Sequence, residues 1–70
     1  MITKKEKEIL DIIKDFINKN GYSPTIREIG GIAKLKSPST VYSHLINLRK
    51  KGYINYMDGK MRTISVMEVE

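Results

Sequence analysis

Two helix starts that lie close together constrain this chain more than any other feature. Residues 25–28, TIRE, form a capping box, in which a threonine hydroxyl and a glutamate carboxylate accept backbone N–H groups at a helix N-terminus. Residues 37–38, SP, are a second start, because serine is a good N-cap and proline is favoured at the first helical position. The spacing predicts two helices, over about 26–33 and 38–50, joined by a turn at 34–36.

A third capping box, TKKE at residues 3–6, precedes the first apolar pattern of the chain. Isoleucine and phenylalanine then recur at helical spacing on one face, with lysine and acidic residues on the other. The pair Asn20-Gly21 ends the pattern, because glycine adopts the left-handed conformation of a helix C-cap at little cost. This pattern predicts a core-building helix over about 4–19.

The residues after the third predicted helix, which should end at Gly52, are typical of a hairpin. Residues 53–57 and 62–66 alternate between apolar and polar side chains, and Asp58-Gly59 favours a two-residue type I′ turn. We therefore predict one domain over residues 1–70, mainly α with a small β-hairpin, in the arrangement of a three-helix winged helix-turn-helix.

The composition excludes several classes of protein. The chain has no cysteine and one histidine, His44, which is too little for a metal site. His44 falls beside the apolar stripe of its helix, which favours a partly buried, hydrogen-bonded side chain. No apolar run reaches the roughly 20 residues of a membrane span, and the N-terminus lacks a signal-peptide core. We therefore expect a cytoplasmic protein. Because the chain also lacks a nucleophile–base pair, we expect no enzyme, no cofactor and no small-molecule substrate.

The net charge of +5 is concentrated on the second half of the helical region and the hairpin. Residues 27–62 carry eight basic residues against two acidic ones, a net of +6. Such a field attracts polyanions through counterion release, although a lysine-rich surface can also be merely solvated. The cluster at 49–51 equally suits the dipole at a helix C-terminus, so Lys34 and Lys36, which flank the start of the third helix, are better phosphate candidates.

The outer face of the third predicted helix consists of small hydroxyl side chains. On a helical wheel, Ser39 and Ser43 lie opposite the apolar stripe, and Thr40 and Asn47 lie on one flank. Serine and threonine can hydrogen-bond several base edges, which favours a helix that enters the major groove of double-stranded DNA. The alternative is an ordinary helical hairpin in which Ser37 only caps the helix.

Basic residues also lie near the predicted hairpin tip. Lys60 and Arg62 would place a basic wing against the DNA backbone or in the minor groove, whereas the alternative is a turn whose lysine faces solvent. The aromatic residues are scattered and form no platform for unpaired bases, which disfavours RNA binding. Tyr42 is the exception, because it lies beside the proposed DNA-contacting face.

Together these motifs resemble the N-terminal DNA-binding domain of the LexA repressor family. The resemblance covers roughly residues 3–66 and is carried by GYSPTIREI at 21–29, SPSTV at 37–41, HL at 44–45, Leu48, and KGYI at 51–54. It implies a transcriptional repressor of the SOS response whose third helix contacts operator bases. It also implies that the wing and helix ends hold phosphates, and that two domains bind a palindromic operator as a homodimer.

Carried over position by position, the resemblance implies two sets of DNA contacts. The base-contacting candidates are Ser37, Ser39, Thr40, Tyr42 and Ser43, and the helical wheel adds Asn47. The phosphate-binding candidates are Arg27, Lys36, Lys51, Lys60 and Arg62, and the charge pattern adds Lys34 and Lys50.

Three departures from the family pattern bear on these expectations. The family usually has glycine where Lys34 stands, so this lysine must adopt a left-handed conformation or the turn must differ. Ile46 and Tyr42 replace smaller or polar residues near the proposed DNA-contacting face, which leaves room for a different operator preference. The self-cleaving C-terminal domain of the family is missing. We therefore expect either the DNA-binding domain of a longer repressor or a stand-alone LexA-like regulator.

One rival belongs to another class of protein. A winged helix can serve as a protein–protein interaction module, such as an anti-repressor or an assembly adaptor. Ile46, Tyr42 and the uncharged hydroxyl patch would supply its contact surface.

Overall fold

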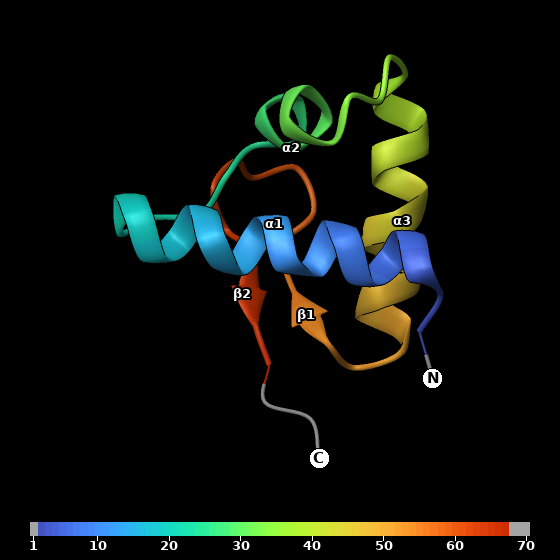
Figure 1. Cartoon of the computed structure of the whole chain (residues 1–70). Coiled ribbons are helices and arrows are strands. Elements are labelled where there is room, and N and C mark those ends of the chain that lie inside the picture. The colour runs from blue at the N-terminus through green and yellow to red at the C-terminus, as the bar shows by residue number, and fades with distance from the viewer. Residues whose placement is uncertain (1, 68–70) are drawn as a thin grey trace.

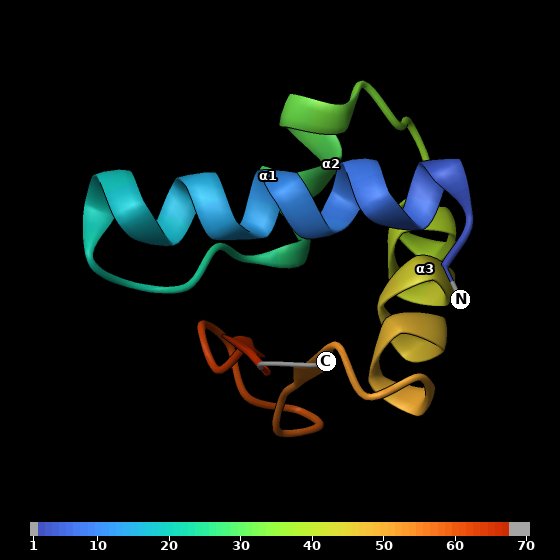
Figure 2. The ribbon, with the colours of Figure 1, turned by 60° about the horizontal axis from the view of Figure 1, so that its bottom comes forward.

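The computed structural model describes residues 2–67, which form three helices and a two-stranded antiparallel hairpin. The elements are α1 (Lys4–Asn20), α2 (Ile26–Ala33), α3 (Pro38–Lys50), β1 (Ile54–Asn55) and β2 (Ser65–Val66). Figure 1 shows α3 running steeply across the N-terminal end of α1, with α2 on one side of α1 and the two strands on the other, while the loop between the strands reaches back to the side of α2. The turned view in Figure 2 separates the hairpin clearly from α1 and places it beside the C-terminal half of α3. This is the predicted architecture of a small winged helix-turn-helix.

Two of the helix starts are capping boxes, as predicted. In α1, Thr3 Oγ1 accepts from the Glu6 N–H at 3.1 Å, while the Thr3 N–H donates to the Glu6 carboxylate at 3.0 Å. The same pair of bonds joins Thr25 and Glu28 at the start of α2, at 3.1 and 2.9 Å. The start of α3 differs, because Ser37 stands at the N-cap position but its hydroxyl makes no capping hydrogen bond.

One hydrophobic core holds all five elements together. The apolar stripe predicted for α3 is buried as expected, with Val41, Leu45 and Leu48 at most 1% exposed. Full burial of each such side chain stabilises the fold by roughly 1.5–3 kcal/mol. His44, beside this stripe, is partly buried as predicted, but its side chain takes part in none of the hydrogen bonds found within residues 2–67. The complete core is Ile9, Leu10, Ile13, Ile29, Val41, Leu45, Leu48, Ile54 and Ile64.

The two glycines within α2 have different surroundings. A Cβ atom built on Gly30 would lie 3.4 Å from both the Leu35 carbonyl oxygen and Val41 Cγ2, which is the close limit of ordinary van der Waals contact. A Cβ atom on Gly31 would meet no atom within 4 Å. Gly30 therefore packs against the turn and the start of α3, whereas Gly31 faces open space.

The turn between α2 and α3 keeps its left-handed geometry although it carries a lysine. Lys34 has φ 60° and ψ 38°, and its N–H donates to the Gly30 carbonyl at the C-terminus of α2. The Leu35 N–H donates to the same carbonyl at 2.9 Å. A side chain in this conformation is strained, and glycine is the residue that adopts it freely.

We predict that Lys34→Gly raises the free energy of unfolding by about 0.5–1 kcal/mol, because relief of the left-handed strain exceeds the added entropy of the unfolded chain. Urea denaturation followed by circular dichroism measures this change. Lys36→Gly is the matched control, since it removes the same charge at an exposed turn position without positive φ, and it should not stabilise the domain. A Lys34→Gly variant that is less stable than the wild type would contradict the prediction.

The hairpin differs from the sequence prediction. Only Ile54↔Val66 and Asn55↔Ser65 pair, so the strands are shorter than 53–57 and 62–66, and residues 56–64 form a loop that we call the wing loop. The predicted type I′ turn is wrong, because Gly59 has φ 75° but Asp58 does not have the positive φ that this turn needs. The Met57 N–H donates to Thr63 Oγ1 at 2.9 Å instead of to a facing strand. A side chain thus replaces the backbone ladder beyond Asn55.

An ion pair between a buried carboxylate and a partly exposed lysine joins the first helix to the end of the third. Glu6 is 3% exposed, and Lys51 Nζ donates to its carboxylate at 2.7 Å. The hydrogen bond from Lys51, followed by the Thr3 N–H, lowers the pKa of Glu6 below its ordinary value. Because the folded state holds this carboxylate ionised, its contribution to stability is complete above the unfolded pKa and is lost as the pH falls through the lower folded value.

We predict that Glu6→Gln lowers the free energy of unfolding by about 1–2 kcal/mol at pH 7, since glutamine can keep the cap but loses the charge-assisted bond to Lys51. The difference between variant and wild type should shrink as the pH falls below the ordinary glutamate pKa of 4.5. Thermal unfolding across pH 3–7 measures both effects, with Glu8→Gln, an exposed acid on the same helix, as the control. A constant difference over that range would contradict the ion-pair explanation.

Candidate nucleic-acid interface

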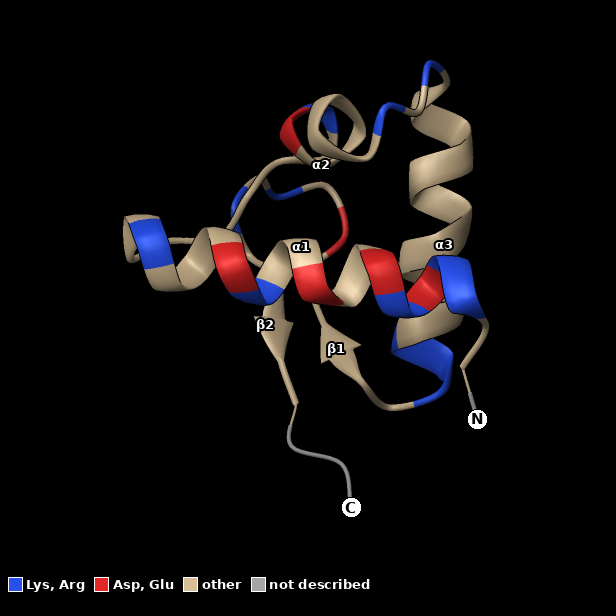
Figure 3. Ribbon diagram, in the orientation of Figure 1, with Lys and Arg blue, Asp and Glu red and all other residues tan. Residues whose placement is uncertain are grey.

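The exposed face of α3 carries the base-contacting candidates. Ser37, Ser39, Thr40, Ser43 and Asn47 are all exposed on or just before this helix. Their small polar side chains leave donors and acceptors at the surface, and α3 itself carries no acidic residue, as Figure 3 shows. The arrangement agrees with the helical wheel, because the buried stripe turns this face away from the core.

Tyr42 lies at the edge of the same face and is partly fixed in place. Its side chain is 39% exposed, and its ring centroid lies 6.3 Å from that of Tyr56 in the wing loop. The Tyr56 hydroxyl is buried without a hydrogen-bond partner among the described residues, and this burial raises the pKa of Tyr56. Contact with the wing loop therefore restricts the positions that Tyr42 can take.

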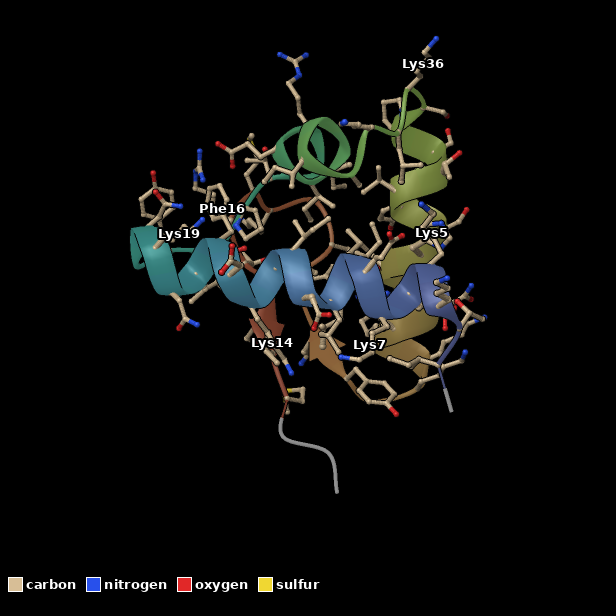
Figure 4. The ribbon with its side chains drawn as sticks, in the orientation of Figure 1. Lys5, Lys7, Lys14, Phe16, Lys19 and Lys36 are labelled. Atoms are coloured by element: carbon tan, nitrogen blue, oxygen red, sulfur yellow. The ribbon has the colours of Figure 1, made fainter. Side chains whose placement is uncertain are left out.

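Exposed cations border the hydroxyl face. Lys34 and Lys36 lie in the turn before α3, and Figure 4 shows Lys36 pointing away from the body of the domain. Lys50 lies at the other end of the helix, while Arg27 lies on α2 and Lys60 on the wing loop. Within residues 2–67 none of these five side chains forms an ion pair, which leaves their charges available to a polyanion.

Two other phosphate candidates are used inside the domain. Lys51 forms the ion pair with buried Glu6. Arg62 donates to both carboxylate oxygens of Glu28, at 3.0 and 3.2 Å, and to the Ser23 carbonyl at 3.0 Å. The Thr25 N–H, followed by the Arg62 guanidinium, lowers the pKa of Glu28 below its ordinary value. Both cations therefore have a structural partner that the sequence did not reveal.

Arg49, which the sequence placed only in a basic cluster, has a structural role that local patterns did not indicate. Its guanidinium lies 4.0 Å from the centroid of the Tyr56 ring and donates to the Tyr56 carbonyl at 3.3 Å and to Asp58 at 3.2 Å. Arg49 thus ties the wing loop to the C-terminal end of α3. No local pattern could have indicated this, because the partners belong to an irregular loop.

A groove of about 620 Å³ separates the start of α2, α3 and the wing loop. Tyr42 and Tyr56 are among its lining residues, and so are the exposed cations Arg27 and Lys60. On the wing loop, Met57 and Met61 are 61% and 78% exposed, which gives the wing an apolar surface beside Lys60. The groove therefore brings Tyr42 of α3 and residues of the wing loop to one surface.

Other kinds of site find no support in the described residues. Residues 2–67 contain no group of three or more histidine, cysteine, aspartate or glutamate side chains that could hold a metal ion. No helix in this range is long and apolar enough to cross a membrane.

The three helices, the exposed polar face of α3 and the basic hairpin define a small winged helix-turn-helix domain. The family model described as LexA DNA binding domain matches residues 1–63, and the chain belongs to this family.

Proteins named LexA repressor are similar to nearly the whole chain. That of Halalkalibacterium halodurans is 45% identical over 69 residues, or 99% of this chain, and that of Shouchella clausii is 47% identical over 68 residues, or 97%. The LexA repressor of Caldicellulosiruptor saccharolyticus is 48% identical over 67 residues, or 96%. The matched region is 33% of each of these proteins, so the chain spans about a third of the length of its relatives.

Proposed function

We propose that this domain binds operator DNA sequence-specifically, as the DNA-binding part of a LexA-like transcriptional repressor. The observation that carries this proposal is the polar, acid-free face of α3 with exposed lysines at both ends. A DNA duplex has hydrogen-bond donors and acceptors in the floor of its major groove and phosphates along the rims of that groove. The polar face of α3 therefore matches the floor of the groove, and the lysines match the phosphates. Membership of the LexA DNA-binding domain family supports the same function.

In the proposed complex, α3 enters the major groove with its N-terminal half against the base edges. Ser39, Thr40 and Ser43 supply hydroxyls that donate or accept, and the methyl group of Thr40 can contact a thymine methyl. Tyr42 and Asn47 contact bases at the edges of the helix. Ser37 is well suited to a DNA contact, because its hydroxyl is not used to cap the helix.

The phosphate contacts come from the exposed cations that border this face. We propose Lys34 and Lys36 at the start of α3, Lys50 at its end, Arg27 on α2 and Lys60 on the wing. The charge of Lys51 is already paired with that of Glu6, so we give Lys51 a smaller part in DNA binding. These contacts position the domain and provide affinity that does not depend on sequence.

One domain of this size makes few base contacts, so we propose that two copies bind a palindromic operator as a homodimer. The names of the relatives support a repressor, and the resemblance supports regulation of the SOS response. The domain would then act on the bacterial nucleoid in the cytoplasm, by binding rather than by catalysis.

We predict that Ser39→Ala and Thr40→Ala each weaken binding to the preferred operator by about threefold to tenfold, with little effect on random duplex, because one base-edge hydrogen bond is lost. In-vitro selection first identifies the operator, and fluorescence anisotropy then measures both affinities. Ser65→Ala, an exposed serine on β2, is the control and should change neither. Equal losses on operator and random duplex would rule out base contacts by these residues.

We predict that Lys36→Ala weakens binding to operator and random duplex alike and reduces the slope of log K against log salt by about 1. The measurement is a titration of both duplexes at several salt concentrations. Lys14→Ala is the control, since Figure 4 places this lysine on α1, far from the start of α3. A wild-type domain that binds no duplex at low salt would instead favour a protein–protein interaction module.

A further inference from the structure

The wing loop is held by contacts other than a β-ladder. Only two residue pairs join β1 and β2, so the backbone of residues 56–64 needs other support. Two arginines provide it, each with its guanidinium over a tyrosine ring. Arg49 lies over Tyr56 at 4.0 Å on the side of α3, and Arg62 lies over Tyr22 at 4.8 Å on the side of α2.

The contacts of Arg62 are unusually complete for a surface cation. Its two terminal nitrogens donate to the two oxygens of Glu28, which is the bidentate geometry of strong arginine–carboxylate pairs. Its backbone is left-handed, with φ 56°, a conformation that a non-glycine residue keeps only where tertiary contacts hold it. A phosphate ligand on a flexible wing would need neither of these features.

The partners of Arg62 are themselves anchored. Glu28 also caps α2 through the Thr25 N–H. The Tyr22 ring packs edge-on against Phe16, with centroids 5.8 Å apart. Ser23, which is 7% exposed, accepts from the Ile64 N–H at 3.1 Å, so the same short segment also fixes the end of the wing loop.

We propose that Arg62 is a positioning residue rather than a phosphate ligand: with Glu28 and Tyr22 it clamps the wing loop to the start of α2. The clamp sets where Lys60 lies relative to α3, and hence whether the wing and the helix contact one duplex together. This inference rests on the proposed DNA binding, and it replaces the role that the sequence suggested for Arg62. Both N–H groups of Nη1 and one of Nη2 are used by Ser23 and Glu28, so Arg62 cannot bind a phosphate through both terminal nitrogens while it holds Glu28.

The substitution Glu28→Gln distinguishes a phosphate ligand from a positioning residue, because the two roles of Arg62 predict opposite changes in DNA affinity. If Arg62 binds phosphate directly, removal of the neighbouring negative charge should strengthen DNA binding. If Arg62 acts through Glu28, the variant should bind operator about threefold to tenfold more weakly, because the wing is displaced. Glutamine can retain the capping box at the start of α2, so this helix should be preserved.

The complete experiment uses Glu28→Gln, Arg62→Lys, the double variant and Glu8→Gln as a charge-matched control on α1. Arg62→Lys keeps the positive charge but loses the bidentate geometry. We expect the two single variants to lose affinity to a similar extent, the double variant to lose no more, and the salt slope to stay unchanged. Stronger binding by Glu28→Gln, or additive losses with a smaller salt slope, would overturn the clamp.

A second measurement tests the clamp without DNA. In the free protein, both single variants should shift the backbone amide resonances of residues 59–64 and speed hydrogen exchange at Ile64, while Glu8→Gln should not. Unchanged wing resonances in both variants would overturn the clamp, whatever the domain binds. Failure of the wild-type domain to bind duplex would overturn the proposed function alone.

Discussion

The burial of one stripe of α3 determines what the rest of the molecule presents. Val41, Leu45 and Leu48 pack into the core and fix the rotation of the helix about its axis. Side chains on the opposite side of the helix must then point outward, so no further contact is needed to expose the hydroxyl face to solvent. The contact of Gly30 with the start of α3 and the left-handed turn at Lys34 set the direction from which α3 meets α2.

The wing is built by a different principle. Its strands are too short to determine the path of residues 56–64, so side chains do so instead. Thr63 replaces a ladder hydrogen bond, and Arg49 and Arg62 fasten the loop to α3 and to the start of α2. The rigid helix and the wing are therefore linked through arginines, and both can be oriented before any ligand arrives, which reduces the ordering cost of binding.

Local patterns predicted the helices well because their signals lie within a few residues of each other. The capping boxes at Thr3 and Thr25 and the stripe of α3 are of this kind. The hairpin was predicted less well, since Asp58-Gly59 favours a tight turn locally while the contact between Arg62 and Glu28 favours a wider loop. That contact joins residues 34 positions apart, and nothing in either local sequence specifies it.

The ion pairs show why the number of basic residues overstates the number of cations available to DNA. A compact basic domain repels itself, and Glu6 and Glu28 relieve this by pairing with Lys51 and Arg62 at the junctions between elements. Each of these two acids also caps a helix, so one carboxylate serves local and tertiary structure together. A cation held in this way is already paired before DNA arrives. It therefore neutralises few phosphates and displaces few counterions from the DNA. The salt dependence of a single domain should therefore follow the exposed cations around α3 rather than its total positive charge.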